Sequence, residues 1–208
     1  MGPEPGTRRD LRDTIFEAAR RVIDEQGLQA ATTRRIAEVA GCAEGTIYRH
    51  FEDKHELFHE LLAASAPEFL PRVAELPGLA GQGTVRETLC LFGVAALRFF
   101  RAVLPFVGGS IVDPELREQQ KQRFDAKNRG PAHSLKQLEG YLRAEGELGR
   151  LGSGVPSDGA AAALLGAAFS KAYLDVWLGP EVLGPRRDED FVAGVVEVLL
   201  QGLLPRSS

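Results

Sequence analysis

Residues 32–58 read TTRRIAEVAGCAEGTIYRHFEDKHELF, and the spacing of the apolar residues in this stretch decides the fold. In the first half, Ile36 falls on the apolar face of a short helix that Gly41 is expected to close. In the second half, Ile47 and Phe51 are about one helical turn apart and can pack back on that face. The stretch therefore predicts two short helices joined by a tight glycine turn.

A longer helix is predicted before this pair, from about Thr7 to Gln26, with Gly27 as its stop. Two short helices behind a longer supporting helix make a helix-turn-helix. The rest of the chain follows helical periodicity without convincing two-residue alternation. Pro67 and Pro71 are expected to interrupt a fourth helix; later helices are predicted at about 84–103, 114–128, 131–146, 157–178 and 188–203, with loops at 77–83 and 104–114.

The quoted run resembles the DNA-binding signature of the TetR (tetracycline-repressor-like) transcriptional regulators, over roughly residues 8–60. The residues that carry the resemblance in register are Thr33, Ile36, Ala37, Ala40, Gly41, Gly45, Thr46, Tyr48, Phe51 and Lys54. The resemblance implies an all-α fold. It places an N-terminal three-helix helix-turn-helix DNA-binding domain at residues 1–53 and a helical effector-binding and dimerisation domain at residues 54–208.

The second short helix is the expected recognition helix, because a helix fits the major groove of B-DNA and its first residues meet base edges. Arg49 is the best candidate for bidentate recognition of guanine, although it could equally hold a phosphate. Arg34 and Arg35 could instead pair only with Glu38 on a solvated helix face. The DNA contacts that the resemblance implies come from Thr33, Arg34, Glu44, Gly45, Thr46, Tyr48, Arg49, His50 and Lys54.

Two residues depart from the family pattern. Ala43 stands where a serine or threonine cap is common, which removes about 1 kcal/mol of helix stabilisation unless another group supplies it. Glu44 stands where lysine or glutamine is common. Its negative charge interacts favourably with the helix dipole and repels phosphate. Its carboxylate can only accept a hydrogen bond, from a donor such as the cytosine amino group. The net charge of −4 means that phosphate contacts must be local, and Arg8, Arg9 and Arg12 are further candidates for them.

Residues 55–59 read HELFH, the H-E-x-x-H pattern in which two imidazoles bind zinc and the glutamate acts as general base. A zinc-dependent hydrolase using His55, Glu56 and His59 is therefore the alternative from another class. No third ligand follows at a recognised spacing, and the segment falls on the family's fourth helix, so two exposed helix histidines are the simpler interpretation. We expect no metal, no cofactor and no enzymatic activity.

The last two predicted helices are apolar on more than one face, and by resemblance they form a four-helix dimer bundle. An aromatic stripe on the first of them is most simply core packing, but the resemblance raises the alternative of an effector cavity. The predicted dimer contacts are Ala161, Leu164, Ala168, Ala172, Val192, Val195, Val196 and Leu199. The predicted effector contacts are Phe92, Phe99, Phe124, Tyr141, Phe169, Tyr173 and Trp177.

Only Cys42 and Cys90 are present, no secretory h-region is visible, and the longest apolar runs look too short to span a bilayer. We therefore expect a cytoplasmic protein with no membrane partner. The sequence predicts a ligand-responsive transcriptional regulator, more often a repressor in the resembling family. It would bind a palindromic operator in double-stranded DNA as a homodimer and respond to a small apolar effector. A constitutive DNA-binding protein without an effector is the remaining alternative.

Overall fold

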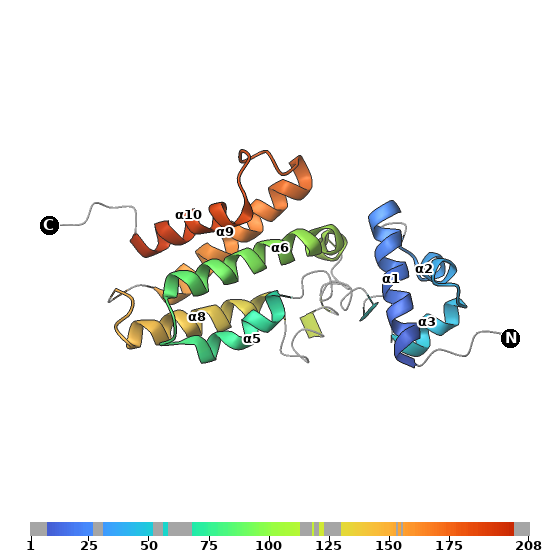
Figure 1. Ribbon diagram of the computed structural model, residues 1–208, viewed down its shortest axis with the longest axis horizontal. Helices are drawn as coiled ribbons and strands as arrows, with labels where there is room; N and C mark the ends of the chain where they lie inside the picture. Colours follow the sequence, from blue (N-terminus) through green and yellow to red (C-terminus); the bar gives the residue numbers. More distant parts are fainter. Residues whose placement is uncertain are drawn as a thin grey trace. The chain divides into compact units, whose positions relative to one another are not determined.

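The computed structural model describes residues 8–26, 31–51, 56–57, 68–112, 118, 121–122, 130–152, 154 and 156–201. Within these ranges the regular structure is helical and contains no strand, which confirms the all-α fold class (Figure 1). Contacts within the chain divide it into two compact units, Met1–Ser65 and Ala66–Ser208. The predicted boundary between residues 53 and 54 lies outside the described residues.

The N-terminal unit contains α1 (Arg8–Gln26), α2 (Thr33–Ala40) and α3 (Glu44–His50), as predicted. Thr32 caps α2, since its hydroxyl oxygen accepts from the Arg35 backbone N–H at 3.1 Å. Gly41 ends the same helix in the left-handed region, at φ 68°, where glycine has no steric penalty. The shared apolar core consists of Ile15, Ala18, Ala19, Val22, Ala31, Ile36, Ala37, Ile47, Phe51 and Leu57.

The end of α3 is held against α1 by one aromatic and one cationic contact. The Phe16 and Phe51 rings meet edge to face with centroids 5.4 Å apart. The Arg12 guanidinium lies 4.7 Å from the centroid of the Phe51 ring and donates to the His50 carbonyl at 3.0 Å. Arg12 therefore has a structural role inside this unit, in place of the phosphate contact considered from the sequence.

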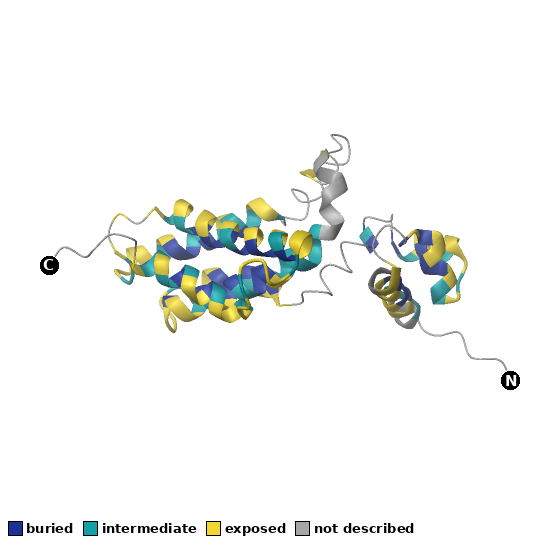
Figure 2. Ribbon diagram, turned by 90° about the horizontal axis from the view of Figure 1, so that it is seen from above, coloured by how far each residue is buried: buried dark blue, intermediate teal, exposed yellow. Residues whose placement is uncertain are grey.

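The C-terminal unit contains α5 (Phe69–Leu79), α6 (Val85–Val112), α8 (Pro131–Glu147), α9 (Ser157–Leu178) and α10 (Asp188–Gln201). α6 packs against α5, α9 and α10, while α8 packs against α5 and α9 (Figure 1). Buried residues lie on the helices of this unit, with exposed residues on the outer faces (Figure 2). The buried core includes Phe69, Phe92, Leu97, Leu138, Tyr141 and Leu164.

Two predicted loops are helical instead. α6 continues to Val112, through most of the predicted loop at 104–114, and α5 continues to Leu79 with Pro77 inside it. Pro71 lies in the first turn of α5, where a proline removes no intrahelical hydrogen bond. The predictions failed because proline and glycine have only a local cost, about 3 kcal/mol for an interior proline, which packing of a helix against its neighbours can offset.

α9 is long and apolar enough, by length and composition alone, to cross a membrane, so the expectation that no run has the necessary length is wrong. The physical reason for this composition is its position in the fold. One face of α9 is buried against α6 and α8 within the unit, and Lys171 and Asp175 interrupt its apolar sequence. A core helix of a compact helical unit satisfies the same compositional test.

Four charged side chains form a network where α6, α9 and the start of α10 meet. Lys171 and Asp175 pair on α9, and each side chain is only 2% exposed. Arg101 donates from Nε to the Asp175 carboxylate at 3.1 Å and from Nη2 to Asp188 at 2.8 Å. The hydrogen bond from Arg101 lowers the pKa of Asp188, and the bonds to Asp188 and then Asp175 raise the pKa of Arg101. The network is charge-neutral and joins three helices.

Candidate nucleic-acid interface

The exposed face of α3 is formed by the residues that helical periodicity places together. Glu44, Gly45, Tyr48 and Arg49 are exposed, whereas Ile47 is fully buried in the core of the N-terminal unit. The Tyr48 side chain is 52% exposed although it is large and aromatic. An exposed aromatic ring beside an exposed arginine is typical of a surface that meets a partner.

Arg49 makes no hydrogen bond or ion pair with any of the described residues, so its donors point to solvent. Its guanidinium carries five N–H donors in a planar fork, which matches guanine O6 and N7 or two phosphate oxygens. Gly45 lies beside it, and a Cβ built on this residue would meet nothing within 4 Å. The unit itself therefore does not require glycine at this position, which fits close approach by an external molecule.

Arg34 and Arg35 both pair with Glu38, as the alternative interpretation predicted. Arg34 Nε lies 3.5 Å from one Glu38 oxygen and Arg35 Nη1 lies 3.2 Å from the other. The Arg34 side chain is nevertheless 81% exposed, and such a pair contributes at most about 1 kcal/mol in water. Arg34 can therefore exchange this carboxylate for a phosphate, whereas Arg35 is also bound to Gln26 at 3.3 Å.

Three further side chains connect the start of α2 to α3. The Thr33 hydroxyl donates to the Glu44 carboxylate at 2.6 Å and lies 3.4 Å from the Tyr48 hydroxyl. Thr33 is almost buried, so this contact joins the two short helices directly. Ala43 makes no side-chain cap hydrogen bond, in agreement with the departure noted in the sequence, and α3 carries only Glu44 as an acidic residue in its first turn.

The remaining predicted DNA contacts are less exposed or lie outside the described residues. Thr46 and His50 are half-buried at the edge of the α3 face. Lys54, His55 and His59 lie outside the described residues, and Glu56 is half-buried on a helical segment. Among the described residues, no group of three His, Cys, Asp or Glu side chains could hold a metal ion.

Sequence comparison assigns the N-terminal unit. The family model described as "Bacterial regulatory proteins, tetR family" matches residues 15–61, which include α2, α3 and the HELFH segment. Residues 15–61 of the chain are therefore similar to the tetR family. The HELFH pattern lies within this matched region, and the zinc-hydrolase alternative has no support from the comparison.

Curated relatives match the chain over about a third of its length. The HTH-type transcriptional repressor AcnR of Corynebacterium diphtheriae is 42% identical over 64 residues, 31% of this chain and 34% of the relative. A HTH-type transcriptional repressor of Mycobacterium tuberculosis is 40% identical over 70 residues, 34% of this chain and 37% of the relative. The chain thus spans about a third of the length of the curated relatives that it matches.

Solved structures share the fold over nearly the whole chain. The FadR regulator of Bacillus subtilis, crystallised with stearoyl-CoA, has a TM-score of 0.65 at 21% identity, covering 92% of this chain and 99% of that one. A TetR/AcrR-family regulator from Thermobifida fusca has a TM-score of 0.63 at 22% identity, covering 94% and 100%. At these identities the likeness establishes the fold of both units.

Most of the residues predicted to form dimer contacts are buried in the single chain. Val195 and Leu199 are half-buried at the surface of α10. The other six side chains pack inside the C-terminal unit: Ala161, Leu164, Ala168, Ala172, Val192 and Val196. Apolar periodicity marks a buried face without telling what covers it, so the dimer interface stays a prediction.

The predicted effector contacts divide between core and surface. Phe92 and Tyr141 are buried, and Phe99 is half-buried. Burial raises the pKa of the Tyr141 hydroxyl. Phe124 lies outside the described residues. The stripe on α9 faces outward instead of lining a cavity, with Phe169 42%, Tyr173 46% and Trp177 67% exposed. In the single chain the stripe is thus largely at the surface, and its role in effector binding stays a prediction.

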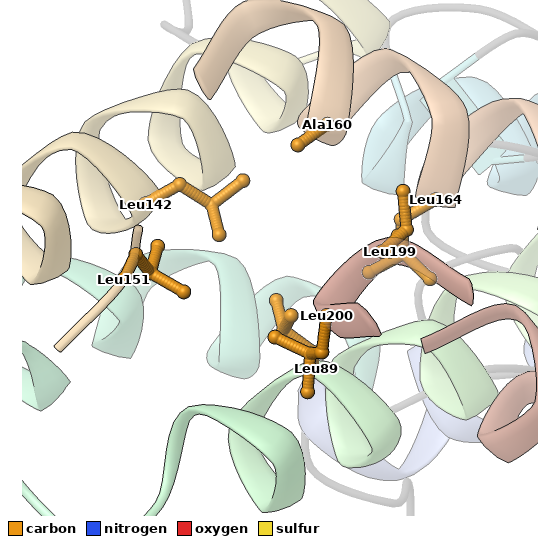
Figure 3. Close-up of a pocket in the computed structure, with 7 residues that line it drawn as sticks. All are labelled: Leu89, Leu142, Leu151, Ala160, Leu164, Leu199 and Leu200. Atoms are coloured by element: carbon orange, nitrogen blue, oxygen red, sulfur yellow. The ribbon is translucent and has the colours of Figure 1, made fainter. Parts of the chain in front are cut away.

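The hollows of the C-terminal unit include a small cavity and a surface cleft. The cavity, of about 20 Å³, is lined by Leu89 of α6, Leu142 of α8, Ala160 and Leu164 of α9, Leu199 and Leu200 of α10, and Leu151 (Figure 3). That volume holds no more than a single water molecule. The other is a surface cleft of about 340 Å³ between α5 and the start of α6, which we name the α5–α6 cleft. Its lining includes Arg72, Leu79, Thr88 and Phe92.

Proposed function

We propose that this chain is a cytoplasmic transcriptional repressor that binds a palindromic operator as a homodimer and responds to a small effector bound by its C-terminal unit. The observation that carries the proposal is the exposed face of α3, with Tyr48 beside Gly45 and with Arg49, which pairs with none of the described residues. The names of the curated repressors that match the same region support it. The role is regulatory binding, without catalysis.

DNA recognition divides between base edges and phosphates. Arg49 is the group proposed to read guanine in the major groove, with Tyr48 beside it on the same face. Arg34, which is mostly exposed, and Lys54 are proposed to hold phosphates on either side of the groove. To bind a phosphate, Arg34 must break its ion pair with Glu38, which costs little free energy at the surface. The release of counterions from DNA offsets this cost.

The proposed dimer contact is an outward surface of α9 that we name the aromatic face: Phe169, Tyr173, Val176 and Trp177. These residues follow i, i+4, i+7 and i+8, so they form one continuous stripe on the helix. Three aromatic side chains that are about half exposed present on the order of 300 Å² of apolar surface before their neighbours are counted. Such a patch on a folded chain is typical of an interaction surface.

The effector site that we propose is the α5–α6 cleft. Its volume, about 340 Å³, is within the range of small-molecule sites, whereas the leucine cavity is far too small. Arg72 lines the cleft, and its guanidinium can bind an acidic or carbonyl group of an otherwise apolar molecule. The adjoining loop is held in place by Glu145, which accepts from the Gly81 backbone N–H at 3.0 Å.

The proposed mechanism is linkage between the two sites. An effector that binds more tightly to the conformation with low DNA affinity shifts the population away from the operator-bound form. The same coupling free energy must appear in both directions, so operator DNA would weaken effector binding by the same factor. This reciprocity separates a responsive repressor from a constitutive DNA-binding protein, for which added small molecules would leave DNA affinity unchanged.

Selection from a random duplex pool, followed by fluorescence anisotropy, tests the proposal. We expect a palindromic site, and at least about tenfold weaker binding to a scrambled duplex of the same length. Arg49→Ala should lose about 1–3 kcal/mol on the selected site and relax preference at one position per half-site. Arg143→Ala removes a similarly exposed arginine, 61% exposed on α8, and should change neither. Equal affinity of the unmodified protein for selected and scrambled duplexes would contradict the proposal.

A further inference from the structure

The contact between Thr33, Glu44 and Tyr48 fixes the direction of two hydroxyl protons. An ionised carboxylate accepts hydrogen bonds and cannot donate. The Thr33 hydroxyl therefore gives its single proton to Glu44, at 2.6 Å. The Tyr48 hydroxyl, 3.4 Å from the same Thr33 oxygen, can bond to it only as the donor. The result is a directed chain from Tyr48 through Thr33 to Glu44.

This direction decides what the surface offers to DNA. Both hydroxyl protons are used inside the protein, so Tyr48 presents lone pairs to its surroundings. Glu44 adds a negative charge on the exposed face of α3. Phosphate oxygens and the O6 and N7 atoms of guanine are acceptors, so they find no hydroxyl donor here. The amino groups of cytosine and adenine are donors in the major groove and match these acceptors.

We propose that Glu44 is a specificity-determining residue. It holds the Thr33 and Tyr48 protons inward, so this part of the recognition surface binds an amino-bearing base, cytosine or adenine, and disfavours phosphate. The inference rests on the proposed operator binding and adds the chemical class of base that faces the start of α3. It also gives Glu44 a second effect, because its charge weakens binding to DNA of arbitrary sequence.

Glu44→Gln tests this assignment, because it keeps the shape of the side chain and removes the charge. In anisotropy titrations, affinity for a scrambled duplex should rise about fivefold, the effect of one charge at about 4 Å in water. Across a panel with every operator position substituted, the preference for cytosine should disappear at one position per half-site, because the glutamine amide adds an N–H donor that the cytosine amino group cannot accept.

Glu38→Gln is the matched control. Glu38 is also an exposed carboxylate of the N-terminal unit, but it pairs with Arg34 and Arg35 and touches neither hydroxyl. Its loss should shift all duplexes together and leave the preference at each position unchanged. Circular dichroism of each variant verifies that α3 remains folded.

Three outcomes are distinguishable. If the unmodified protein prefers no duplex, the proposed function itself fails. If it prefers a palindrome and Glu44→Gln lowers affinity for every duplex equally, Glu44 only stabilises the N-terminus of α3 and the inference is overturned. An unchanged base preference in Glu44→Gln overturns it as well, whatever happens to the overall affinity.

Discussion

Replacement of Asp175 by asparagine should destabilise the C-terminal unit more than any single change at its surface. The Asp175 carboxylate is 2% exposed and accepts from both Lys171 and Arg101. Without it, the Lys171 ammonium is still buried, and its other contact is the Pro180 carbonyl at 3.5 Å. A buried charge that loses its counter-charge is strongly unfavourable, because the protein interior solvates it far less well than water does.

The expected magnitude follows from this geometry. Breaking a buried ion pair from one side costs about 3–5 kcal/mol, against a total unfolding free energy of about 5–15 kcal/mol for a typical domain. For a unit of this size the midpoint of thermal unfolding should fall by roughly 10 °C. Urea unfolding followed by circular dichroism at pH 7, at one fixed protein concentration, measures the change in free energy.

Two controls separate burial from charge. The double variant Lys171→Met with Asp175→Leu removes both charges and should be within about 1–2 kcal/mol of the unmodified protein. Asp190→Asn breaks the pair between Asp190 and Arg187, whose side chains are 53% and 77% exposed, and should leave the free energy of unfolding nearly unchanged. A loss below about 1 kcal/mol for Asp175→Asn, or a double variant as unstable as the single one, would refute the burial argument.

Three further predictions concern the dimer, acid stability and metal content. Trp177→Glu should convert the dimer to a monomer in sedimentation at micromolar concentration without loss of helicity. Leu148→Glu, at a residue that is 57% exposed and lies away from the aromatic face, should leave the dimer intact. A monomeric unmodified protein would contradict the proposed dimer. The pKa of Asp188 is lowered in the folded state, so its contribution to stability is fully present at pH values above the unfolded pKa, near 3.8. This contribution is lost as pH falls through the lower folded pKa. Asp188→Asn should therefore weaken the fall of the unfolding free energy at acid pH. Metal analysis should find no stoichiometric zinc, and a zinc content that disappears in His55→Ala and His59→Ala would show this to be wrong.

The helix-turn-helix could be predicted because its determinants are local. Gly41 ends α2 in a left-handed conformation, and Ile47 lies on the buried side of α3 as its spacing required. The DNA-facing residues follow from the same periodicity, since a face that excludes Ile47 must contain Tyr48 and Arg49. The hydrogen bond from Thr33 to Glu44 was not predictable in this way, because it joins two helices through side-chain rotamers.

In the C-terminal unit, the sequence alone determined that α9 and α10 are apolar helices, and only the tertiary structure decided which faces of them are buried. Ala168 is 1% exposed, whereas its neighbour Phe169 is 42% exposed, the reverse of the roles that side-chain size suggested. The small residue faces inward because α6 and α8 both pack against α9, which leaves little room on that side for an aromatic ring. A helix that is apolar all round satisfies the hydrophobic effect in several orientations, and steric fit against helices distant in the sequence selects one of them.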